Sequence, residues 1–335
     1  MLKKNHKLLI FGGAGSLGHE LVSFYKELSG QIVVVSRDEA KHWELKNKFN
    51  CNLKTVICDV RDSRRVSQVI RDENPDYIII AQALKQVDTC ENQPSEAIDT
   101  NIIGVRNILD AIEENLYKSN NLISKVCFVS TDKACNPINV YGMCKSISEK
   151  MVLAVGKKHN NVVFVVTRYG NVLSSKGSII PLFLKQAQEA NSFTVTDRRM
   201  TRFIMLLEES VALIHQALLF GKSGDVWIPA LDSFAILDLA NYFSLKFNKP
   251  VTYTGIRPGE KIHEVLMSEE ERMQSKIVGE SFVINSSNST DNTMVVDYSS
   301  KDHLVSFEEL TRRLNQFLET QTYERNKNDG KIRLF

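Results

Sequence analysis

The sequence lacks a strong excess of charge of either sign. Its 42 lysine and arginine residues nearly balance 40 aspartate and glutamate residues, which leaves a formal net charge of only +2. Proteins that bind nucleic acid usually carry a pronounced basic patch or stripe. The composition therefore gives no electrostatic case for a nucleic-acid partner.

Long apolar runs are also lacking near the N-terminus. The stretch from Met1 to Lys7 is polar and basic, and the apolar run after it extends only from Leu8 to Phe11. A membrane-spanning helix needs about 20 apolar residues, and a signal peptide also needs a longer apolar segment than this one. We expect neither a signal peptide nor a membrane partner.

Closely spaced cysteine pairs are absent. The chain has six cysteines and no C-x-x-C motif, and several cysteines lie in apolar or strand-like surroundings. Reduced intracellular cysteines usually have this distribution. We predict a soluble cytoplasmic protein without a metal site.

The first half of the chain alternates short apolar runs with segments of helical spacing. With 335 residues, 43% of them hydrophobic, the chain can bury a large core. The predicted strands are 8–11, 32–35, 53–57, 77–81, 126–129 and 162–166; the predicted helices are 17–28, 39–49, 63–71, 95–114 and 141–157. Continuously apolar strands that alternate with helices indicate an α/β protein with a Rossmann-type, doubly wound parallel sheet.

The pattern changes after about residue 174. Helical segments at 179–189, 208–219, 237–247 and 306–318 are separated by short strands and loops, with a polar loop at 286–292. We predict a dinucleotide-binding domain over residues 1–173. A smaller substrate-binding lobe over 174–320 would send some segments back to the first domain, and 321–335 would form a polar tail.

Three glycines follow the first predicted strand. Gly12, Gly15 and Gly18 form a G-x-x-G-x-x-G pattern at the start of the next helix. Glycines there let the backbone turn tightly and approach a pyrophosphate, which meets the N-terminus of the helix. We predict a dinucleotide site that also includes Ser16 and Leu17.

The end of the second predicted strand bears on the choice of dinucleotide. An acid there binds the ribose 2′-hydroxyl of NAD, whereas an arginine accommodates the 2′-phosphate of NADP. Ser36 and Arg37 come first and Lys41 follows, so we favour NADP, with NAD as the alternative because Asp38 is close. Further predicted cofactor contacts are Asp59 and Val60, near the adenine, and Ala81, at the end of the fourth strand.

Tyr141 and Lys145 form a Tyr-x-x-x-Lys pair on a predicted helix. Residues four apart share a helix face, and a lysine beside a phenol lowers the pKa of that phenol. The phenolate can take a proton from an alcohol while hydride leaves the same carbon. The pair indicates hydride chemistry on an alcohol, with both residues close to the nicotinamide.

Thr131, Asp132 and Lys133 follow the fifth predicted strand, at the sheet edge where ligands of such folds bind. An acid and an amine beside a Tyr-x-x-x-Lys pair can also move protons at neighbouring carbons. Once carbon 4 of a sugar is oxidised, a neutral lysine could remove the hydrogen on carbon 5. A protonated aspartate could protonate the leaving hydroxyl of carbon 6. The combination fits a sugar dehydratase better than a simple dehydrogenase.

Several longer motifs carry a resemblance to a known family. They are GGAGSLG (12–18), SRDEAK (36–41), ALKQV (83–87), TNIIG (100–104), STDKACNPINVYGMCK (130–145), TRYGNVLSSKGSIIPLF (167–183), TDRRMTRF (196–203) and GIRPGEKIHE (255–264). With them the chain resembles the extended short-chain dehydrogenases/reductases. Within that group it is similar to the configuration-inverting UDP-N-acetylglucosamine 4,6-dehydratases of the polysaccharide-biosynthesis branch. The resemblance extends from about Leu8 to Met267.

The resemblance implies a role for each matched residue. Tyr141 would be the base at carbon 4, and Lys145 would bind the nicotinamide ribose. Lys133 would take the carbon 5 proton and return one to the opposite face, Asp132 would protonate the leaving water, and Thr131 would bind substrate. The UDP-sugar would be held by Asn171, Ser178, Arg202, Arg257 and Glu260, with Lys85 at either cofactor or substrate. Family members also tend to form homo-oligomers.

The chain departs from the family pattern at Gln82, Gln86 and Ile204, which affects the expected substrate preference. Two other functions stay open. A UDP-N-acetylhexosamine 4-epimerase would use the same oxidation at carbon 4, but would not need Asp132 and Lys133. A non-catalytic NADP-binding protein could also be built on this fold.

Overall fold

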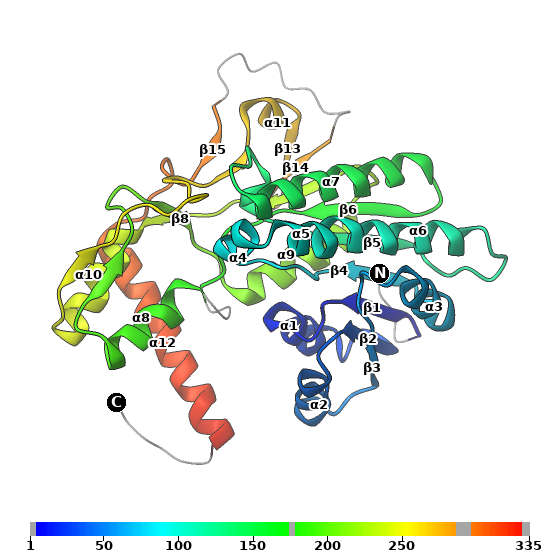
Figure 1. Cartoon of the computed structure of the whole chain (residues 1–335), viewed down its shortest axis with the longest axis horizontal. Helices are drawn as coiled ribbons and strands as arrows, with labels where there is room; N and C mark the ends of the chain where they lie inside the picture. The colour runs from blue at the N-terminus through cyan, green and yellow to red at the C-terminus, as the bar shows by residue number, and fades with distance from the viewer. Residues whose placement is uncertain (1–4, 174–177, 286–295, 330–335) are drawn as a thin grey trace.

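The computed structural model describes residues 5–173, 178–285 and 296–329, with side chains as far as residue 320. Within these residues a nine-stranded sheet dominates the molecule, in the order β13-β14-β9-β6-β5-β4-β1-β2-β3. A smaller lobe built from α8, α10 and α12 lies beside it (Figure 1). Both halves of the sequence therefore contribute to the region where the sheet and the lobe lie side by side.

Six parallel strands form the nucleotide-binding half of the sheet. They are β1 (Lys7–Phe11), β2 (Gln31–Ser36), β3 (Leu53–Ile57), β4 (Tyr77–Ile80), β5 (Lys125–Val129) and β6 (Val163–Thr167). Their order β3-β2-β1-β4-β5-β6 is that of a Rossmann fold, so the predicted fold class is confirmed. The strand order reverses between β1 and β4, where such sheets bind their ligands.

The second half of the chain returns to extend this sheet. β9 (Val226–Pro229) pairs with β6 in parallel, and β14 (Ser281–Ile284) and β13 (Ser275–Val278) add antiparallel strands at that edge. The returning segments anchor the second half beside the end of β6. The division into domains at residue 173 stays a prediction.

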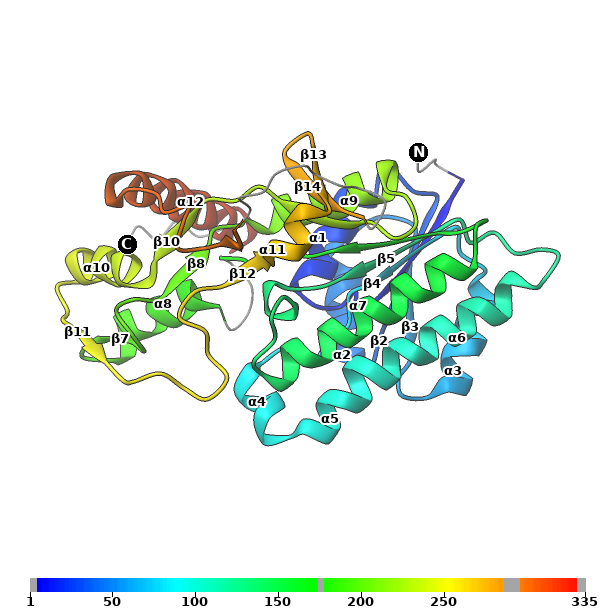
Figure 2. The same ribbon diagram turned by 90° about the horizontal axis from the view of Figure 1, so that it is seen from above.

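Helices cover both faces of the sheet (Figure 2). On one face lie α3 (Ser63–Glu73), α6 (Gly104–Leu116) and α7 (Val140–Lys158); on the other lie α1 (Ser16–Tyr25), α2 (Glu39–Lys48) and α9 (Leu207–Phe220). Alternate strand residues serve the two cores: Leu9 and Phe11 pack into one, and Leu8 and Ile10 into the other. Two-sided burial explains why these strands read as continuously apolar.

The predicted helix at 95–114 was wrong in one respect, because it is interrupted. Helix α4 (Val87–Asn92) and α5 (Pro94–Ile98) precede a π-helical turn, η1 (Asp99–Ile103), from which α6 continues. The Asn101 side chain accepts from the Leu84 amide and donates to the Leu84 carbonyl, both at 2.8 Å. Tertiary hydrogen bonds to a loop thus fix this turn, and local helical spacing cannot reveal them.

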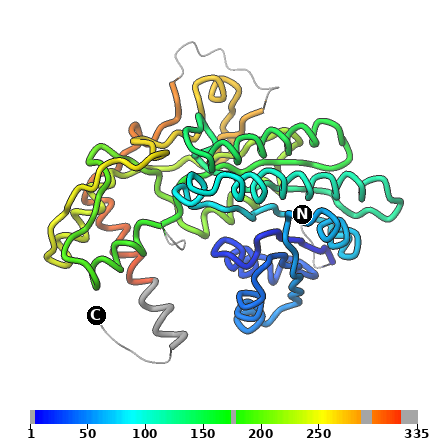
Figure 3. Tube along the Cα trace, viewed as in Figure 1, coloured from blue at the N-terminus to red at the C-terminus, as the bar shows by residue number. Residues whose placement is uncertain are grey.

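The smaller lobe, whose Cα trace is drawn in Figure 3, has its own core, which includes several aromatic side chains. Its elements are α8 (Ile179–Glu189), β7 (Phe193–Val195), β8 (Thr201–Phe203), β10 (Ser233–Ala235), α10 (Ile236–Phe247), β11 (Val251–Tyr253) and α12 (Phe307–Asp329). Phe183 packs edge-on against Phe193 and Phe243. The segments β12 (Val265–Met267), α11 (Glu269–Met273) and β15 (Tyr298–Ser299) link the lobe to the sheet. The polar loop expected at 286–292 lies outside the described residues.

All six cysteines are free thiols, and only Cys51 is not fully buried. Among the helices that the structure describes, none is long and apolar enough to cross a membrane.

Candidate active site

The glycine-rich turn after β1 forms a cradle at the switch point of the sheet. Gly12 has φ = +81°, and a Cβ atom on it would lie 2.6 Å from the Cα of Gln82. A Cβ on Gly18 would clash with the carbonyl oxygen of Gly13. Gly15 begins α1 without a side-chain cap, so the first amide groups of the helix, from Ser16 and Leu17 onward, are open to an anion. These residues fit a dinucleotide pyrophosphate.

The end of β2 carries the residues that were expected to select the cofactor. Asp38 caps α2: its Oδ1 accepts from the Lys41 amide at 3.1 Å, and its Oδ2 lies 2.5 Å from the Lys41 amine. The Ser36 hydroxyl lies 2.7 Å from Nε2 of His42. Because Asp38 is engaged by Lys41, the half-exposed Arg37 is the more open group at this tip.

Asp59, at the end of β3, is held by arginines. Its Oδ2 accepts from Arg61 at 2.7 Å and lies 3.5 Å from Nη1 of Arg37. The hydrogen bond from Arg61 lowers the pKa of Asp59. Next to it, Val60 is buried under Gly104, whose missing side chain leaves room for it. Asp59 and Val60 therefore lie just after the end of β3, with the cations Arg37 and Arg61 beside Asp59.

Residues after β4 lie beside the glycine cradle. The amide of Ala81 donates to the carbonyl of Phe11 at 2.9 Å, which places Ala81 next to Gly12. The side-chain amide of Gln82 is buried and has no partner among the described residues. Lys85 is exposed and likewise has no ion-pair partner in the described part of the chain. Of the other departures from the family pattern, Ile204 is buried in the lobe core.

The acid–amine pair lies directly after β5, on a short 3₁₀ turn, η2 (Asp132–Ala134). The amine of Lys133 donates to Asp132 Oδ1 at 3.0 Å, and the Thr131 hydroxyl donates to the same oxygen at 2.9 Å. Asp132 is fully buried, whereas Lys133 is partly exposed. Asn171, which follows β6, accepts from the Lys133 amine at 3.4 Å. The structure thus brings together Thr131, Asp132, Lys133 and Asn171, as the sequence predicts.

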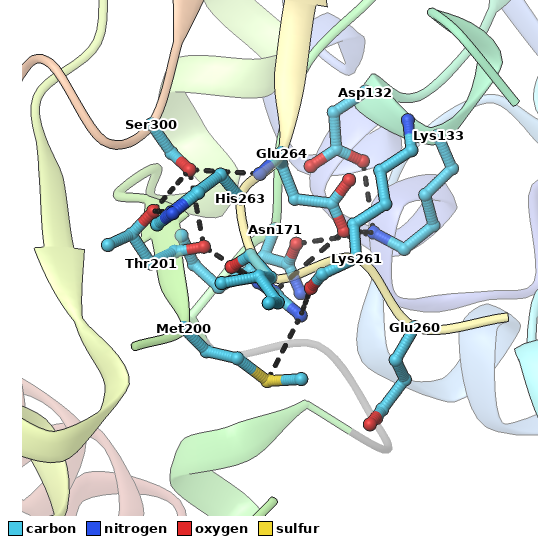
Figure 4. A network of polar contacts seen from close by, with 12 residues as sticks. Asp132, Lys133, Asn171, Met200, Thr201, Glu260, Lys261, His263, Glu264 and Ser300 are labelled. Carbon is cyan, nitrogen blue, oxygen red and sulfur yellow. Dashed lines mark hydrogen bonds and ion pairs between the residues drawn. The ribbon is translucent and has the colours of Figure 1, made fainter. Parts of the chain in front are cut away.

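Glu264 is a member of this cluster that the sequence analysis missed. Its Oε1 lies 3.1 Å from the Lys133 amine, and its side chain is almost completely buried (Figure 4). It directly precedes β12, 131 positions after Lys133 by the difference of their residue numbers. The GIRPGEKIHE motif ends at Glu264, so the motif itself could have pointed to this residue. The residue predicted from the motif was instead Glu260, which lies away from the network in Figure 4.

Burial and neighbouring charges shift the pKa values of Asp132, Lys133 and Glu264. Burial raises the pKa of Asp132, and Glu264 adds to this effect, although Lys133 opposes both. Burial would lower the pKa of Lys133, but the combined attraction of Asp132 and Glu264 raises it. For Glu264, attraction to Lys133 and Arg202 outweighs the effect of burial and lowers the pKa. The resting site therefore favours ionised Glu264 and protonated Lys133, and it makes Asp132 easier to protonate than an ordinary aspartate.

Tyr141 and Lys145 lie on α7 as predicted, but they do not interact as expected. Burial raises the pKa of the Tyr141 phenol to about 12, and the opposing influences are the Lys133 charge and a hydrogen bond with Thr131. Lys145 instead donates to the carbonyl of Val129 at 2.5 Å. We expected Lys145 to lower the pKa of this phenol. In the structure the cation that lowers it is Lys133.

The predicted substrate residues fall into two groups. Arg202, mostly buried on β8, donates to the carbonyls of Thr201, Lys261 and Ile262 at 2.7–3.1 Å, so it differs from the open cation that was expected. Its guanidinium instead holds the segment that leads to Glu264.

Arg257 and Glu260 are close to each other and more accessible. The Arg257 side chain is 60% exposed, and its Nε lies 3.8 Å from Glu260 Oε1. The loop that carries them is fixed to the start of α7, because the Asn139 side chain donates to the Gly259 carbonyl at 2.8 Å. Ser178 begins α8 and donates to the Leu173 carbonyl at 2.8 Å. The loop that carries Arg257 and Glu260 leads along the chain to Glu264 of the acid–amine cluster.

Comparison with known proteins agrees with this architecture. The family model described as polysaccharide biosynthesis protein matches residues 8–286. A Campylobacter jejuni protein named UDP-N-acetylglucosamine 4,6-dehydratase (inverting) is 40% identical over 277 residues, which cover 80% of this chain and 79% of the relative. A Rickettsia bellii protein named UDP-glucose 4-epimerase is 38% identical over 283 residues, covering 81% and 80% of the two chains.

A solved structure is also similar over nearly the whole chain. The X-ray structure of Pen from Bacillus thuringiensis superposes with a TM-score of 0.86 at 32% identity, covering 95% of this chain and 99% of that one. The resemblance inferred from the motifs is thereby confirmed. The chain belongs to the polysaccharide biosynthesis protein family, a Rossmann-fold branch of the extended short-chain dehydrogenases/reductases that acts on nucleotide sugars.

Proposed function

We propose that this protein is an NADP-dependent UDP-N-acetylglucosamine 4,6-dehydratase that inverts carbon 5. The product would be UDP-2-acetamido-2,6-dideoxy-L-arabino-hex-4-ulose, a precursor for polysaccharide biosynthesis. Relatives named dehydratase and epimerase match at similar identity, so their names alone do not decide between the two activities. The choice between dehydratase and epimerase therefore depends on the residues of the candidate active site.

The observation that carries the proposal is the buried contact between Asp132 and Lys133, close to Tyr141. Their side chains are 3.0 Å apart, and the charges of both act on the Tyr141 phenol. Oxidation at carbon 4 and its reversal require only the tyrosine and the cofactor. An acid and an amine in direct contact serve an elimination, in which one proton leaves carbon 5 and another joins the departing hydroxyl.

Each residue then has a defined proton to move. Tyr141 takes the proton of the carbon 4 hydroxyl. When bound, the nicotinamide would accept hydride from carbon 4 and later return it to carbon 6. Lys133 first passes its ammonium proton to Asp132 across their hydrogen bond. The neutral amine then takes the proton of carbon 5, and the C–H electron pair forms the C5=C6 double bond. The C6–O bond breaks, and Asp132 gives its proton to the leaving hydroxide, which departs as water. Lys133 then returns a proton to carbon 5 from the opposite face.

The bound cofactor would use the cradle at Gly12, Gly15 and Gly18 for its pyrophosphate. NADP is supported by the engagement of Asp38 with Lys41 and by the exposed Arg37 at the same tip. A 2′-phosphate would compete with Asp59 for Arg37 and with His42 for the Ser36 hydroxyl. Lys145 is tied to β5 and would lie near the nicotinamide ribose. For the UDP-sugar, the exposed Arg257 suits the diphosphate and Glu260 a ribose hydroxyl, while Asn171, Ser178 and Lys85 border the sugar.

Mass spectrometry of the reaction with UDP-N-acetylglucosamine tests the proposal. The purified protein with added NADP should convert the substrate into a nucleotide sugar that is lighter by one water. Conversion to UDP-N-acetylgalactosamine, which leaves the mass unchanged and is detected by chromatographic separation of the two isomers, would instead establish the epimerase. NADP binding without turnover of any UDP-hexose would support a non-catalytic protein.

We further propose that the chain forms a homo-oligomer. Four large apolar side chains on the helices from α5 to α7 are about half exposed: Ile98, Ile103, Met143 and Ile147. A second copy would remove them from water. Sedimentation of the protein as a monomer at micromolar concentration would contradict this proposal.

A further inference from the structure

The amine of Lys133 lies between two buried carboxylates from distant parts of the chain. Asp132 approaches it at 3.0 Å from the turn after β5, and Glu264 at 3.1 Å from the residue before β12. Glu264 is held by contacts of its own, because its amide donates to the Ser300 hydroxyl at 3.0 Å. The position of Glu264 relative to Lys133 is therefore built into the fold.

Two oxygen atoms of this cluster have no hydrogen-bond partner among the described residues. They are Oδ2 of Asp132 and Oε2 of Glu264, and both are buried. Two carboxylates flank one ammonium, and an unpartnered buried carboxylate oxygen is costly. A proton on one of the two carboxylates removes that cost for the group that carries it.

The neighbours of the two carboxylates indicate which one takes the proton. Glu264 also faces Arg202 at 3.8 Å and the charge of Lys261, so it has three cations around it. Asp132 has Lys133 as its cation and otherwise faces Thr131, Glu264 and the Tyr141 phenol. Glu264 is thus the better-stabilised anion, and Asp132 is the site for the proton.

We propose that Glu264 is a positioning residue of the acid–base pair, which holds the Lys133 amine beside Asp132 and supplies the negative charge that lets Asp132 carry a proton. This inference rests on the proposed function. In the elimination, the active pair carries one shared proton, which moves across the 3.0 Å hydrogen bond to give neutral Lys133 and protonated Asp132. The amine then takes the carbon 5 proton, and the acid gives its own to the leaving hydroxide.

The charge on Glu264 has a consequence for the pH profile. A nearby negative charge favours the protonated form of each neighbour, so Glu264 raises the pKa of both Asp132 and Lys133. Water loss needs one proton on the pair, so the rate falls when the pair gains a second proton or loses both. Without the charge of Glu264, both limbs of the profile move to lower pH.

The test compares Glu264→Gln with wild type over the full pH range. The optimum for water loss should move by about one unit to lower pH, with about a tenfold lower rate on the alkaline side. Glu264→Asp keeps the charge and should restore most of the wild-type profile. The matched control is Glu73→Gln, which removes another buried glutamate with a lysine partner, 2.6 Å from Lys54 and remote from the site. It should leave the profile unchanged.

A second readout does not depend on turnover. The infrared carbonyl band of a protonated carboxyl group, assigned to Asp132 by its loss in Asp132→Asn, should titrate at lower pH in Glu264→Gln than in wild type. Equal titration of that band in the two proteins would overturn the inference, as would an unchanged optimum in a variant that folds normally. If the wild type releases no water from any UDP-hexose, the proposed function fails, and the infrared titration still decides the role of Glu264.

Discussion

The amine of Lys145 donates to the carbonyl oxygen of Val129 at 2.5 Å, so it is tied to the end of β5 and not to the Tyr141 phenol four residues earlier. The amine also lies 3.8 Å from the centre of the Phe128 ring. Burial lowers the pKa of Lys145 to about 7. The phenol is influenced instead by Lys133, so in the proposed mechanism one amine would serve both the oxidation at carbon 4 and the elimination.

Lys145 should make the stability of the cofactor-free protein depend on pH. Its folded pKa of about 7 lies below the ordinary value of 10.5, so between these values the unfolded chain binds the proton that the folded chain lacks. Stability should therefore rise with pH in this window. Lys145→Met should be more stable than wild type near pH 7, by a few kcal/mol at most, and urea unfolding should show this advantage shrinking toward pH 10. A difference that is constant with pH would contradict this.

Lys133→Ala should abolish water loss while leaving oxidation at carbon 4 possible. Without the amine no group takes the carbon 5 proton, and general acid–base catalysis is worth about 10²- to 10⁴-fold. Absorbance of the reduced nicotinamide should still appear on addition of substrate, although reduced in rate because Lys133 also favours ionisation of Tyr141. Dehydrated product formed at the normal rate would show that Lys133 is not the base.

Arg37→Ala should weaken NADP binding far more than NAD binding. A charge-assisted hydrogen bond to a phosphate is worth about 1.5–3 kcal/mol, which corresponds to a rise of about 10- to 100-fold in the Kd of NADP. Calorimetric titration with each dinucleotide measures both constants. Equal changes in the Kd of NADP and the Kd of NAD would show that Arg37 does not bind the 2′-phosphate.

Gly12→Ala should prevent normal folding of the cradle. The residue has φ = +81°, and its new Cβ would meet the backbone of Gln82 at 2.6 Å. Gly15→Ala is the matched comparison for stability, because its Cβ would find the nearest atom at 3.6 Å. Thermal unfolding should show a much larger loss for Gly12→Ala. Similar melting temperatures for the two variants would argue against the tight approach of β1 and β4.

Arg168→Met should be strongly destabilising. Arg168 is buried between Glu149 at 2.6 Å and Glu271 at 2.7 Å, so its removal leaves two carboxylates without their cation, at a cost of about 3–5 kcal/mol. Arg199→Met removes an equally short contact, 2.8 Å to Asp197, on the surface and should change stability little. Denaturant unfolding of both variants makes the comparison, and equal losses would contradict the role of burial.

Most strands of the nucleotide-binding half were predictable because they are buried on both faces and read as continuous apolar runs. The edge strand β3, with the sequence LKTVI, is the exception, since it contains Lys54 and Thr55 and has no fully buried residue. The glycine cradle and the pair Asp132–Lys133 were predictable because their residues are neighbours in sequence. Glu264 was not, because its contact with Lys133 depends on how the lobe returns to the sheet. Two further features were missed for the same reason: the π turn at Asp99–Ile103 and the hydrogen bonds of the Arg202 guanidinium to backbone carbonyls. Both depend on hydrogen bonds to segments distant in sequence.

The most direct test of the central claim is proton NMR of the wild-type reaction with UDP-N-acetylglucosamine in heavy water. The proposed mechanism predicts a new methyl signal at carbon 6, deuterium at carbon 5, and ring couplings of the inverted sugar, because Lys133 exchanges its proton with solvent before returning it. Hydrogen retained at carbon 5 in UDP-N-acetylgalactosamine, with no methyl signal, would contradict it and leave Asp132, Lys133 and Glu264 without the roles assigned to them.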